Sequence, residues 1–170
     1  IAAPQGQVGI VTCGKAHDDL MEVLRRLQIA PALLQRLGVR LYKVGLAWPL
    51  ETTGMRVFAA GLKEILVIEE KGPGVEAQLR ELFYNAPESQ RPRLLGKHGR
   101  NGAPLVSDVG ELRPSRLIEL VAQWLGEHFP GHPELAESFQ HVREFTAPPT
   151  LSNAADAVKR QPYFCAGCPH

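Results

Sequence analysis

The segment VGIVTCGKAHDDL at residues 8–20 decides the fold. Its first part, Val8–Cys13, is β-branched and almost entirely apolar, which is typical of a strand, and Gly14 ends that strand. Asp18 and Asp19 follow where the first turn of a helix favours carboxylates near its unpaired amides. The next residues place apolar side chains on one helix face, at spacings of three and four: Leu20, Val23, Leu24 and Leu27. This strand–turn–helix unit needs a sheet that the apolar face can cover.

The same alternation continues along the chain to about residue 128. Apolar segments predict further strands at 39–44, 65–68 and 93–96. Segments with one apolar face predict helices at 31–38, 55–62, 75–83 and 114–126, the last ended by Gly126. The pattern predicts an α/β fold with three layers, α/β/α, around a mainly parallel sheet of about four to five strands. We expect four of its residues to share one interior: Leu20, Val67, Leu79 and Leu117.

The regular pattern ends after residue 128. From Phe129 onward, prolines and glycines interrupt the chain, and only residues 134–145 have the pattern of a short helix. We expect one domain over residues 1–128, a linker over 129–164 and the first residues of a further domain at 165–170. Because the chain starts at Ile1 and stops directly after a cysteine motif, we expect it to be a piece of a longer protein.

Composition and charge exclude several classes of protein. The 170 residues are 44% hydrophobic and 22% charged, which is ordinary for a globular domain. A net charge of +1 provides no large field to attract nucleic acid or an anionic membrane. No apolar run approaches the roughly 20 residues that span a bilayer, and the start lacks a signal pattern, so we expect a cytoplasmic location. The three cysteines form no disulfide framework of the secreted kind.

Seven residues stand where two of the predicted strands end: Thr12, Cys13, Lys15, His17, Glu69, Glu70 and Lys71. The carboxyl ends of parallel strands meet at one edge of a sheet, where open α/β domains bind ligands or dock onto partners. We take these residues as candidates for a domain-docking surface, and a solvated loop edge is the alternative.

Residues 9–16 read G-x-x-x-x-G-K-A and differ at one position from the phosphate loop G-x-x-x-x-G-K-[ST]. Two features oppose nucleotide binding here. Ile10–Cys13 is strand-like rather than a flexible nest of amides, and Ala16 lacks the hydroxyl that binds magnesium. We favour a strand that ends in a tight turn, with Cys13 as a small buried residue rather than a nucleophile.

The last nine residues, PYFCAGCPH at 162–170, are dense in reactive groups. The C-x-x-C turn of Cys165 and Cys168 points two thiols at one metal or cluster, and Gly167 lets the backbone fold closely. Four ligands are usual and only two or three are present, so a zinc knuckle and, less favoured, a redox pair stay open. The remaining histidines show no metal-ligand spacing and are expected to be ordinary surface residues: His98, His128, His132 and His141.

Four segments together carry a family resemblance: GIVTCGKAHDDL (9–20), LYKVGLAWPLE (41–51), ILVIEEK (65–71) and R-x-P-Y-F-C-x-G-C-P-H (160–170). They resemble indolepyruvate:ferredoxin oxidoreductases, within the thiamine-diphosphate-dependent 2-oxoacid:ferredoxin oxidoreductases, and are closest to the long bacterial type with fused subunits. The resemblance extends from about residue 7 to residue 170. It implies that residues 7–128 are a middle domain like the carboxyl-terminal domain of transketolase, between a pyrimidine-binding and a pyrophosphate-binding domain.

The resemblance also implies what the parent enzyme does. It decarboxylates an aryl 2-oxoacid with thiamine diphosphate and magnesium, transfers the acyl group to coenzyme A, and reduces ferredoxin through iron–sulfur clusters. Cys165 and Cys168 resemble two ligands of a [4Fe-4S] cluster, with Gly167 and His170 beside the thiamine cofactor. No catalytic residue is implied within the chain, which by itself is expected to hold no cofactor and to be inactive.

By the same resemblance, the middle domain ties its two flanking domains together and supports a homodimer of the parent. The resemblance leaves the particular 2-oxoacid open. Two other classes of function stay open as well. One is a free-standing α/β module that binds a nucleotide or acyl ligand at the sheet edge, and the other is a zinc-binding interaction domain.

Overall fold

The computed structural model describes residue 3, residues 5–140 and residue 142. The strands are β1 Val8–Cys13, β2 Val39–Val44, β3 Glu64–Ile68 and β4 Arg93–Leu95. The helices are α1 Lys15–Arg26, α2 Pro31–Leu37, α3 Thr52–Ala59, α4 Gly74–Phe83, α5 Pro114–His128 and α6 Pro133–Gln140, with a 3-10 turn η1 at Glu88–Gln90. The predicted alternation of strands and helices is confirmed, and β1 and β2 have the predicted bounds.

The four strands form one parallel sheet in the order β2-β1-β3-β4. In the centre of this sheet, Ile10 of β1 lies opposite Leu41 of β2 on one side and Leu66 of β3 on the other. Every residue of β3 is buried, because helices cover both faces of the central strands. The chain runs from β1 to β2 and then returns to β3 on the other side of β1, so the strand order reverses between β1 and β3.

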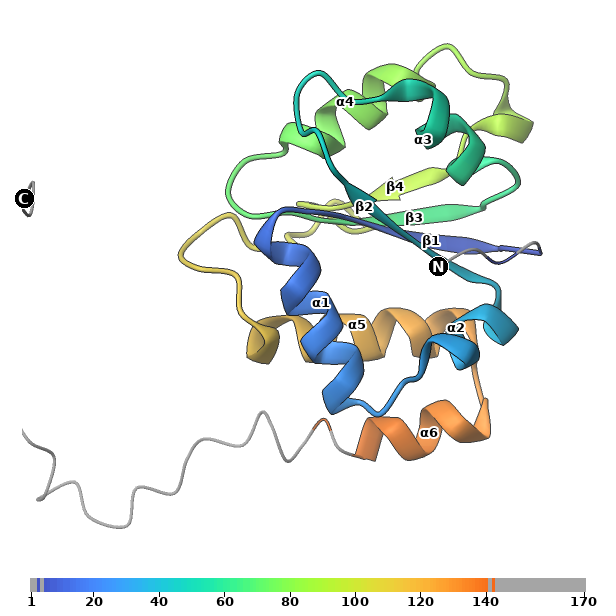
Figure 1. Ribbon diagram of the computed structural model, residues 1–170, viewed down its shortest axis with the longest axis vertical. Coiled ribbons are helices and arrows are strands. Elements are labelled where there is room, and N and C mark those ends of the chain that lie inside the picture. The colour runs from blue at the N-terminus through green and yellow to red at the C-terminus, as the bar shows by residue number, and fades with distance from the viewer. Residues whose placement is uncertain (1–2, 4, 141, 143–170) are drawn as a thin grey trace, which may run out of the picture.

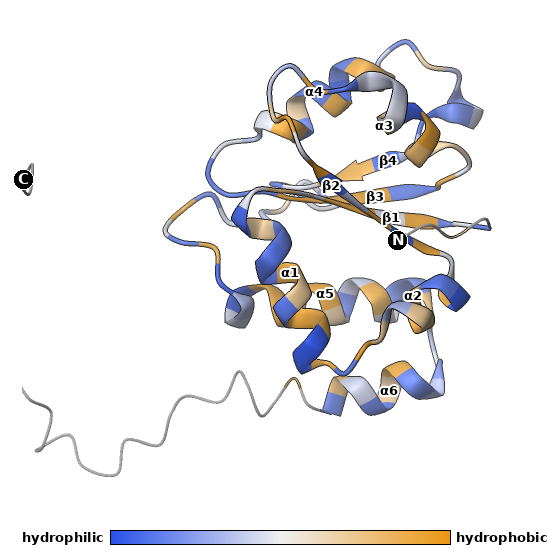
Figure 2. Ribbon diagram, in the orientation of Figure 1, coloured by the Kyte–Doolittle hydropathy of each residue, from blue (hydrophilic) through white to orange (hydrophobic). Residues whose placement is uncertain are grey.

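Helices α1, α2 and α5 cover one face of the sheet, with α6 packed against α5 on the outer side, and α3 and α4 cover the other face (Figure 1). Figure 2 shows that β1 and β3 are largely hydrophobic between these two helical layers. The predicted three-layer α/β/α fold with a parallel sheet is therefore confirmed.

The apolar interior consists of two cores rather than one. Leu20 and Leu117 lie in the core beneath α1 and α5, whereas Val67 and Leu79 lie in the core beneath α3 and α4. The expectation that these four residues share one interior is wrong. Successive side chains of a strand point to opposite faces, so the sheet itself separates the two cores.

Helix α5 ends at His128, two residues later than the predicted end at Gly126. A Cβ atom on Gly126 would lie 3.3 Å from Cε2 of Phe139 in α6, so the glycine permits close packing of the two helices instead of ending one. Helix α6 lies inside the range predicted as a linker, and its Leu135 is buried in the same core as Leu117. The division into residues 1–128, 129–164 and 165–170 stays a prediction.

Candidate functional site

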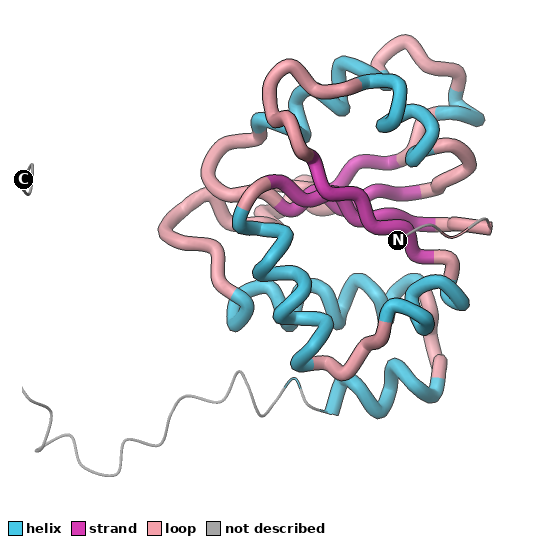
Figure 3. Tube along the Cα trace, viewed as in Figure 1, coloured by secondary structure: helices cyan, strands magenta, loops and turns pink. Residues whose placement is uncertain are grey.

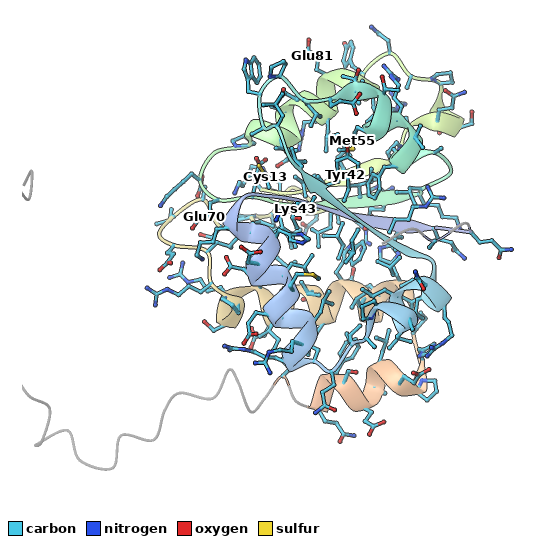
Figure 4. The ribbon with its side chains drawn as sticks, in the orientation of Figure 1. Cys13, Tyr42, Lys43, Met55, Glu70 and Glu81 are labelled. Atoms are coloured by element: carbon cyan, nitrogen blue, oxygen red, sulfur yellow. The ribbon has the colours of Figure 1, made fainter. Side chains whose placement is uncertain are left out.

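The loops that follow β1, β2 and β3 gather at the carboxyl edge of the sheet (Figure 3). A pocket of about 460 Å³ opens at this edge, where the strand order reverses between β1 and β3. Such a crevice is the place where open α/β sheets bind ligands. Four of the seven predicted site residues line the pocket: Cys13, Lys15, Glu69 and Glu70. In Figure 4, the labelled Cys13 and Glu70 lie at this edge.

Strand β1 and the turn that follows it explain the two glycines of the motif that resembles a phosphate loop. Gly14 has φ 56° and ψ −135°, a conformation that residues with a Cβ rarely adopt. Gly9 lies inside β1, where a Cβ would come within 2.7 Å of both Leu62 Cδ1 and Phe58 Cζ. Residues 9–13 pair with β2 and β3 along the strand and form no open amide nest. The glycines therefore serve packing and chain reversal.

Lys15 is committed to contacts within the chain. Its Nζ lies 2.8 Å from Asp19 Oδ2 and donates a hydrogen bond of 2.8 Å to the carbonyl of Leu112. A second carboxylate, Glu111 Oε1, lies 3.6 Å away. These contacts raise the pKa of Lys15, chiefly through the hydrogen bond to Asp19. The lysine ties the start of α1 to the loop before α5.

Glu69 caps helix α4 from a buried position. Its Oε2 accepts the backbone N–H of Val75 at 2.8 Å, and its Oε1 accepts that of Glu76 at 2.9 Å. The residue before the helix is Pro73, which has no side-chain acceptor for these amides. Glu69 thus satisfies two donors that the helix itself leaves unpaired.

Glu70 and Lys71 hold the loop of residues 107–112 against the edge. Glu70 Oε1 accepts the N–H of Leu112 at 2.9 Å, and Lys71 Nζ donates to the carbonyl of Gly110 at 2.8 Å. Together with Lys15, these contacts bind the loop to the ends of both central strands. The charged residues that the sequence predicts as a docking surface therefore stabilise the loops around the pocket.

Thr12 and His17 form a separate pair. Thr12 is buried, and its Oγ1 lies 3.0 Å from His17 Nδ1 and donates a weaker bond of 3.4 Å to the carbonyl of Tyr42. Burial, followed by the positive charge of Lys43, lowers the pKa of His17. Both effects favour the neutral form of the imidazole.

Cys13 has the character of a thiol rather than a thiolate. It is partly buried, and burial raises its pKa, with a smaller contribution from the negative charge of Glu69. Both effects disfavour the thiolate, which is the nucleophilic form. Cys13 is thus partly rather than fully buried, and the absence of a nucleophilic role stays a prediction.

Exposed apolar side chains border the same edge. Trp48 lines the pocket and is 74% exposed, and Leu46 in the same loop is 59% exposed. Val109, in the loop held by Glu70 and Lys71, is also 74% exposed. We call Leu46, Trp48 and Val109 the apolar rim. The sequence analysis did not select these residues, although the Trp-Pro pair in a loop after a strand is a pattern that could have indicated them.

A second group that the sequence analysis missed lies around Glu64 at the start of β3, which is the amino edge of the sheet. Both carboxylate oxygens lie 2.8 Å from guanidinium nitrogens of Arg100. Oε1 also accepts the indole N–H of Trp124 at 2.9 Å and lies 2.8 Å from His128 Nε2. Burial opposes ionisation of Glu64, but the hydrogen bonds from Arg100, His128 and Trp124 outweigh it, so its pKa is lowered. His128 is therefore part of this cluster and not an ordinary surface residue.

The described part of the chain does not fit an iron–sulfur cluster or another metal centre. Within it, no group of three or more histidine, cysteine or acidic residues is arranged to hold a metal. Cys13 is the one cysteine there, and its raised pKa disfavours the thiolate that a metal requires. The tail residues predicted to bind the cluster and cofactor lie outside the described residues: Cys165, Gly167, Cys168 and His170.

None of the helices in the described residues combines the length and the apolar character needed to cross a membrane. The fold and the edge define a class of protein, namely an open parallel α/β domain whose edge charges bind its own loops and whose apolar rim faces outward.

Comparison with known proteins gives this class a family. The family described as indolepyruvate ferredoxin oxidoreductase middle domain matches residues 1–116. The chain therefore belongs to that family. It is 28% identical over 165 residues to the indolepyruvate oxidoreductase subunit IorA of Pyrococcus horikoshii, and 27% identical to that of Thermococcus kodakarensis. Each alignment covers 96% of this chain and 22% of the relative, so the chain spans about a fifth of the length of these relatives.

A solved structure is also similar to the chain. It is a 2-oxoglutarate:ferredoxin oxidoreductase from Magnetococcus marinus, with 2-oxoglutarate, coenzyme A and succinyl-CoA bound. The match has a TM-score of 0.43 and 21% identity, and covers 72% of this chain and 18% of that one.

Proposed function

We propose that the chain is a non-catalytic middle domain of an indolepyruvate:ferredoxin oxidoreductase. In this proposal, it joins a pyrimidine-binding to a pyrophosphate-binding domain within a cytoplasmic homodimer. The parent decarboxylates an aryl 2-oxoacid with thiamine diphosphate and magnesium, transfers the acyl group to coenzyme A and reduces ferredoxin through iron–sulfur clusters. The family match over residues 1–116 supports the parent's class.

The linking role rests on one observation at the carboxyl edge: the charged side chains bond within the chain, whereas the apolar side chains are exposed. Lys15, Glu69, Glu70 and Lys71 all bond to the chain's own helices and loops. The side chains left for contact with another domain are those of the apolar rim. An exposed tryptophan beside a pocket is the kind of residue that dominates an interface, where its removal costs about 2–4 kcal/mol.

The cofactor part of the proposal rests on sequence resemblance. Cys165 and Cys168 are proposed as two ligands of an iron–sulfur cluster, and Gly167 and His170 as residues beside thiamine diphosphate. Within the described residues, no group of three or more histidine, cysteine or acidic side chains could hold a metal, so we assign the cluster to the tail.

The test is a pair of double variants in the full-length parent enzyme. Leu46→Ser with Trp48→Ser removes most of the apolar rim. Val57→Ser with Tyr84→Ser removes two side chains that are equally exposed, at 71% and 76%, but lie on α3 and after α4. All four changes are at the surface, so neither pair should lower the melting temperature of the isolated chain. The rim pair should reduce assembly and 2-oxoacid-dependent ferredoxin reduction at least tenfold, and the control pair should not.

Equal effects of the two pairs on the parent would contradict a docking role for the rim. A free-standing module that binds a nucleotide or acyl ligand is the second candidate, and the position of the pocket at the strand reversal favours it. Titration of the isolated chain with coenzyme A, followed by amide NMR, separates the two. Tight binding that shifts the signals of Cys13, Gly14 and Lys15 would favour the second candidate.

A further inference from the structure

A larger cleft lies at the opposite, amino edge of the sheet, between the start of β3, η1 and β4. Its volume is about 750 Å³. The charged residues that line it are four cations and two acids: Lys63, Arg91, Arg93 and Arg100, with Glu64 and Glu88. This excess of cations contrasts with the net charge of only +1 for the whole chain.

The charges in this cleft are not equally available. Glu64 and Arg100 neutralise each other, and Arg100 also pairs with Glu127. Lys63 Nζ makes one long hydrogen bond, 3.4 Å, to the side chain of Gln7. Within the described residues, the guanidinium groups of Arg91 and Arg93 make no hydrogen bond or ion pair. Three cations therefore face the cleft with Glu88 as their one unpaired acidic neighbour.

Arg91 and Arg93 lie two residues apart in an extended segment beside the cleft. Arg91 is extended, with φ −105° and ψ 97°, and leads through the buried Pro92 into β4, which begins at Arg93. In an extended segment, residues two apart point to the same side and lie about 6.6 Å apart. Pro92 is buried, whereas Arg91 and Arg93 are exposed and both line the cleft, so two guanidinium groups are available at one site.

We propose that this cleft binds a phosphate-bearing small molecule, with Arg91 and Arg93 holding a diphosphate group and Lys63 adding a third positive charge. Guanidinium groups form paired, charge-assisted hydrogen bonds with phosphate oxygens. The cleft has the volume of a small-molecule site. A concave patch of three cations is too small to follow a nucleic-acid backbone. The site lies at the edge opposite the apolar rim, so its failure would leave the proposed docking function untouched.

The test uses the 170-residue chain and three probes: inorganic phosphate, inorganic pyrophosphate and adenosine diphosphate. Calorimetry measures affinity, and amide NMR locates the binding. Pyrophosphate should bind at least tenfold more tightly than phosphate and should shift the signals of Lys63, Arg91 and Arg93. Equal affinities for pyrophosphate and adenosine diphosphate would assign recognition to the phosphates alone, and tighter binding of the latter would assign it to a nucleotide. Either result supports the shared chemistry.

The deciding variant is Arg91→Gln with Arg93→Gln, which should weaken pyrophosphate binding at least tenfold. Arg25→Gln with Arg113→Gln removes the same charge from side chains that are 72% and 65% exposed elsewhere, and should leave binding unchanged. If the first pair fails to fold, Lys63→Gln replaces it, with an expected loss of about threefold. Equal weakening by the control, the absence of binding, or tighter binding of a hexaglutamate peptide than of pyrophosphate would each overturn the proposal.

Discussion

Glu69 and Glu51 provide a matched pair for measuring what burial adds to a helix cap. Both carboxylates accept two backbone N–H groups, Glu69 at 2.8 and 2.9 Å from the start of α4 and Glu51 at 2.7 and 2.7 Å from the start of α3. Glu69 is only 6% exposed, whereas Glu51 is open to water. The same substitution therefore leaves two amides without water in one case and with water in the other.

The expected magnitude follows from the two bonds. A hydrogen bond to a charged group contributes about 1.5–3 kcal/mol, and a buried amide left unpaired costs about 1–3 kcal/mol. Loss of both bonds in Glu69→Ala should therefore lower the free energy of unfolding by about 3 kcal/mol. Glu69→Gln keeps one acceptor oxygen and should cost about half as much. Glu51→Ala should cost clearly less than Glu69→Ala, because water replaces the lost acceptor.

Urea unfolding followed by far-UV circular dichroism is the assay, with the denaturant slope required to stay constant across the variants. Hydrogen exchange at Val75 and Glu76 should also accelerate in Glu69→Ala. If Glu69→Ala costs no more than Glu51→Ala, burial does not determine the strength of the cap, and the reasoning fails.

Three further predictions follow from the structure. Because the pKa of Glu64 is lowered in the folded protein, its carboxylate stabilises the fold above its unfolded pKa of about 4.3, and this contribution disappears as the pH falls through the folded value. The melting temperatures of the wild type and Glu64→Gln should therefore converge as the pH falls below about 4.3, and a constant gap would contradict this. Gly9→Ala should destabilise the fold by about 1–3 kcal/mol in urea unfolding, because its Cβ would collide with Leu62 and Phe58; an unchanged midpoint would mean that both side chains move freely. Alkylation of Cys13 by iodoacetamide at pH 7, followed by peptide mass analysis, should be slower than for an exposed cysteine peptide and should accelerate above pH 9, since burial raises the pKa of this thiol.

The sequence predicted the fold well where the signal is local. The bounds of β1 follow from a short apolar run ended by Gly14, and those of β2 from the segment VRLYKV ended by Gly45. The position of seven residues at the carboxyl edge follows from the parallel order of the strands. What those residues contact was not predictable, because their partners lie far along the chain. Glu70 bonds to Leu112, 42 residues later, and nothing in either segment indicates this bond.

The contacts of the buried Glu64 were also not predictable from the sequence. In the sequence, it stands as a polar residue before the apolar run of β3, which is typical of a strand end open to water. In the structure, Arg100, Trp124 and His128 enclose it from the loop after β4 and from α5, 36 to 64 residues away. The two cores show a related limit, since the sequence marks which residues are apolar but gives little sign of which sheet face each will cover.

In the linking role that we propose, the distribution of contacts would let one small domain hold two neighbours in a fixed geometry. A docking surface loses less free energy on binding when its side chains and loops are already ordered. At the carboxyl edge, Lys15 and Glu70 bond to Leu112, and Lys71 bonds to Gly110, so the loop that carries Val109 is anchored within the chain. In the proposed docking role, these polar contacts would act indirectly, by ordering the loops around the apolar rim. At the amino edge, the guanidinium groups of Arg91 and Arg93 make no such contact within the described residues, which supports the proposal of a ligand there.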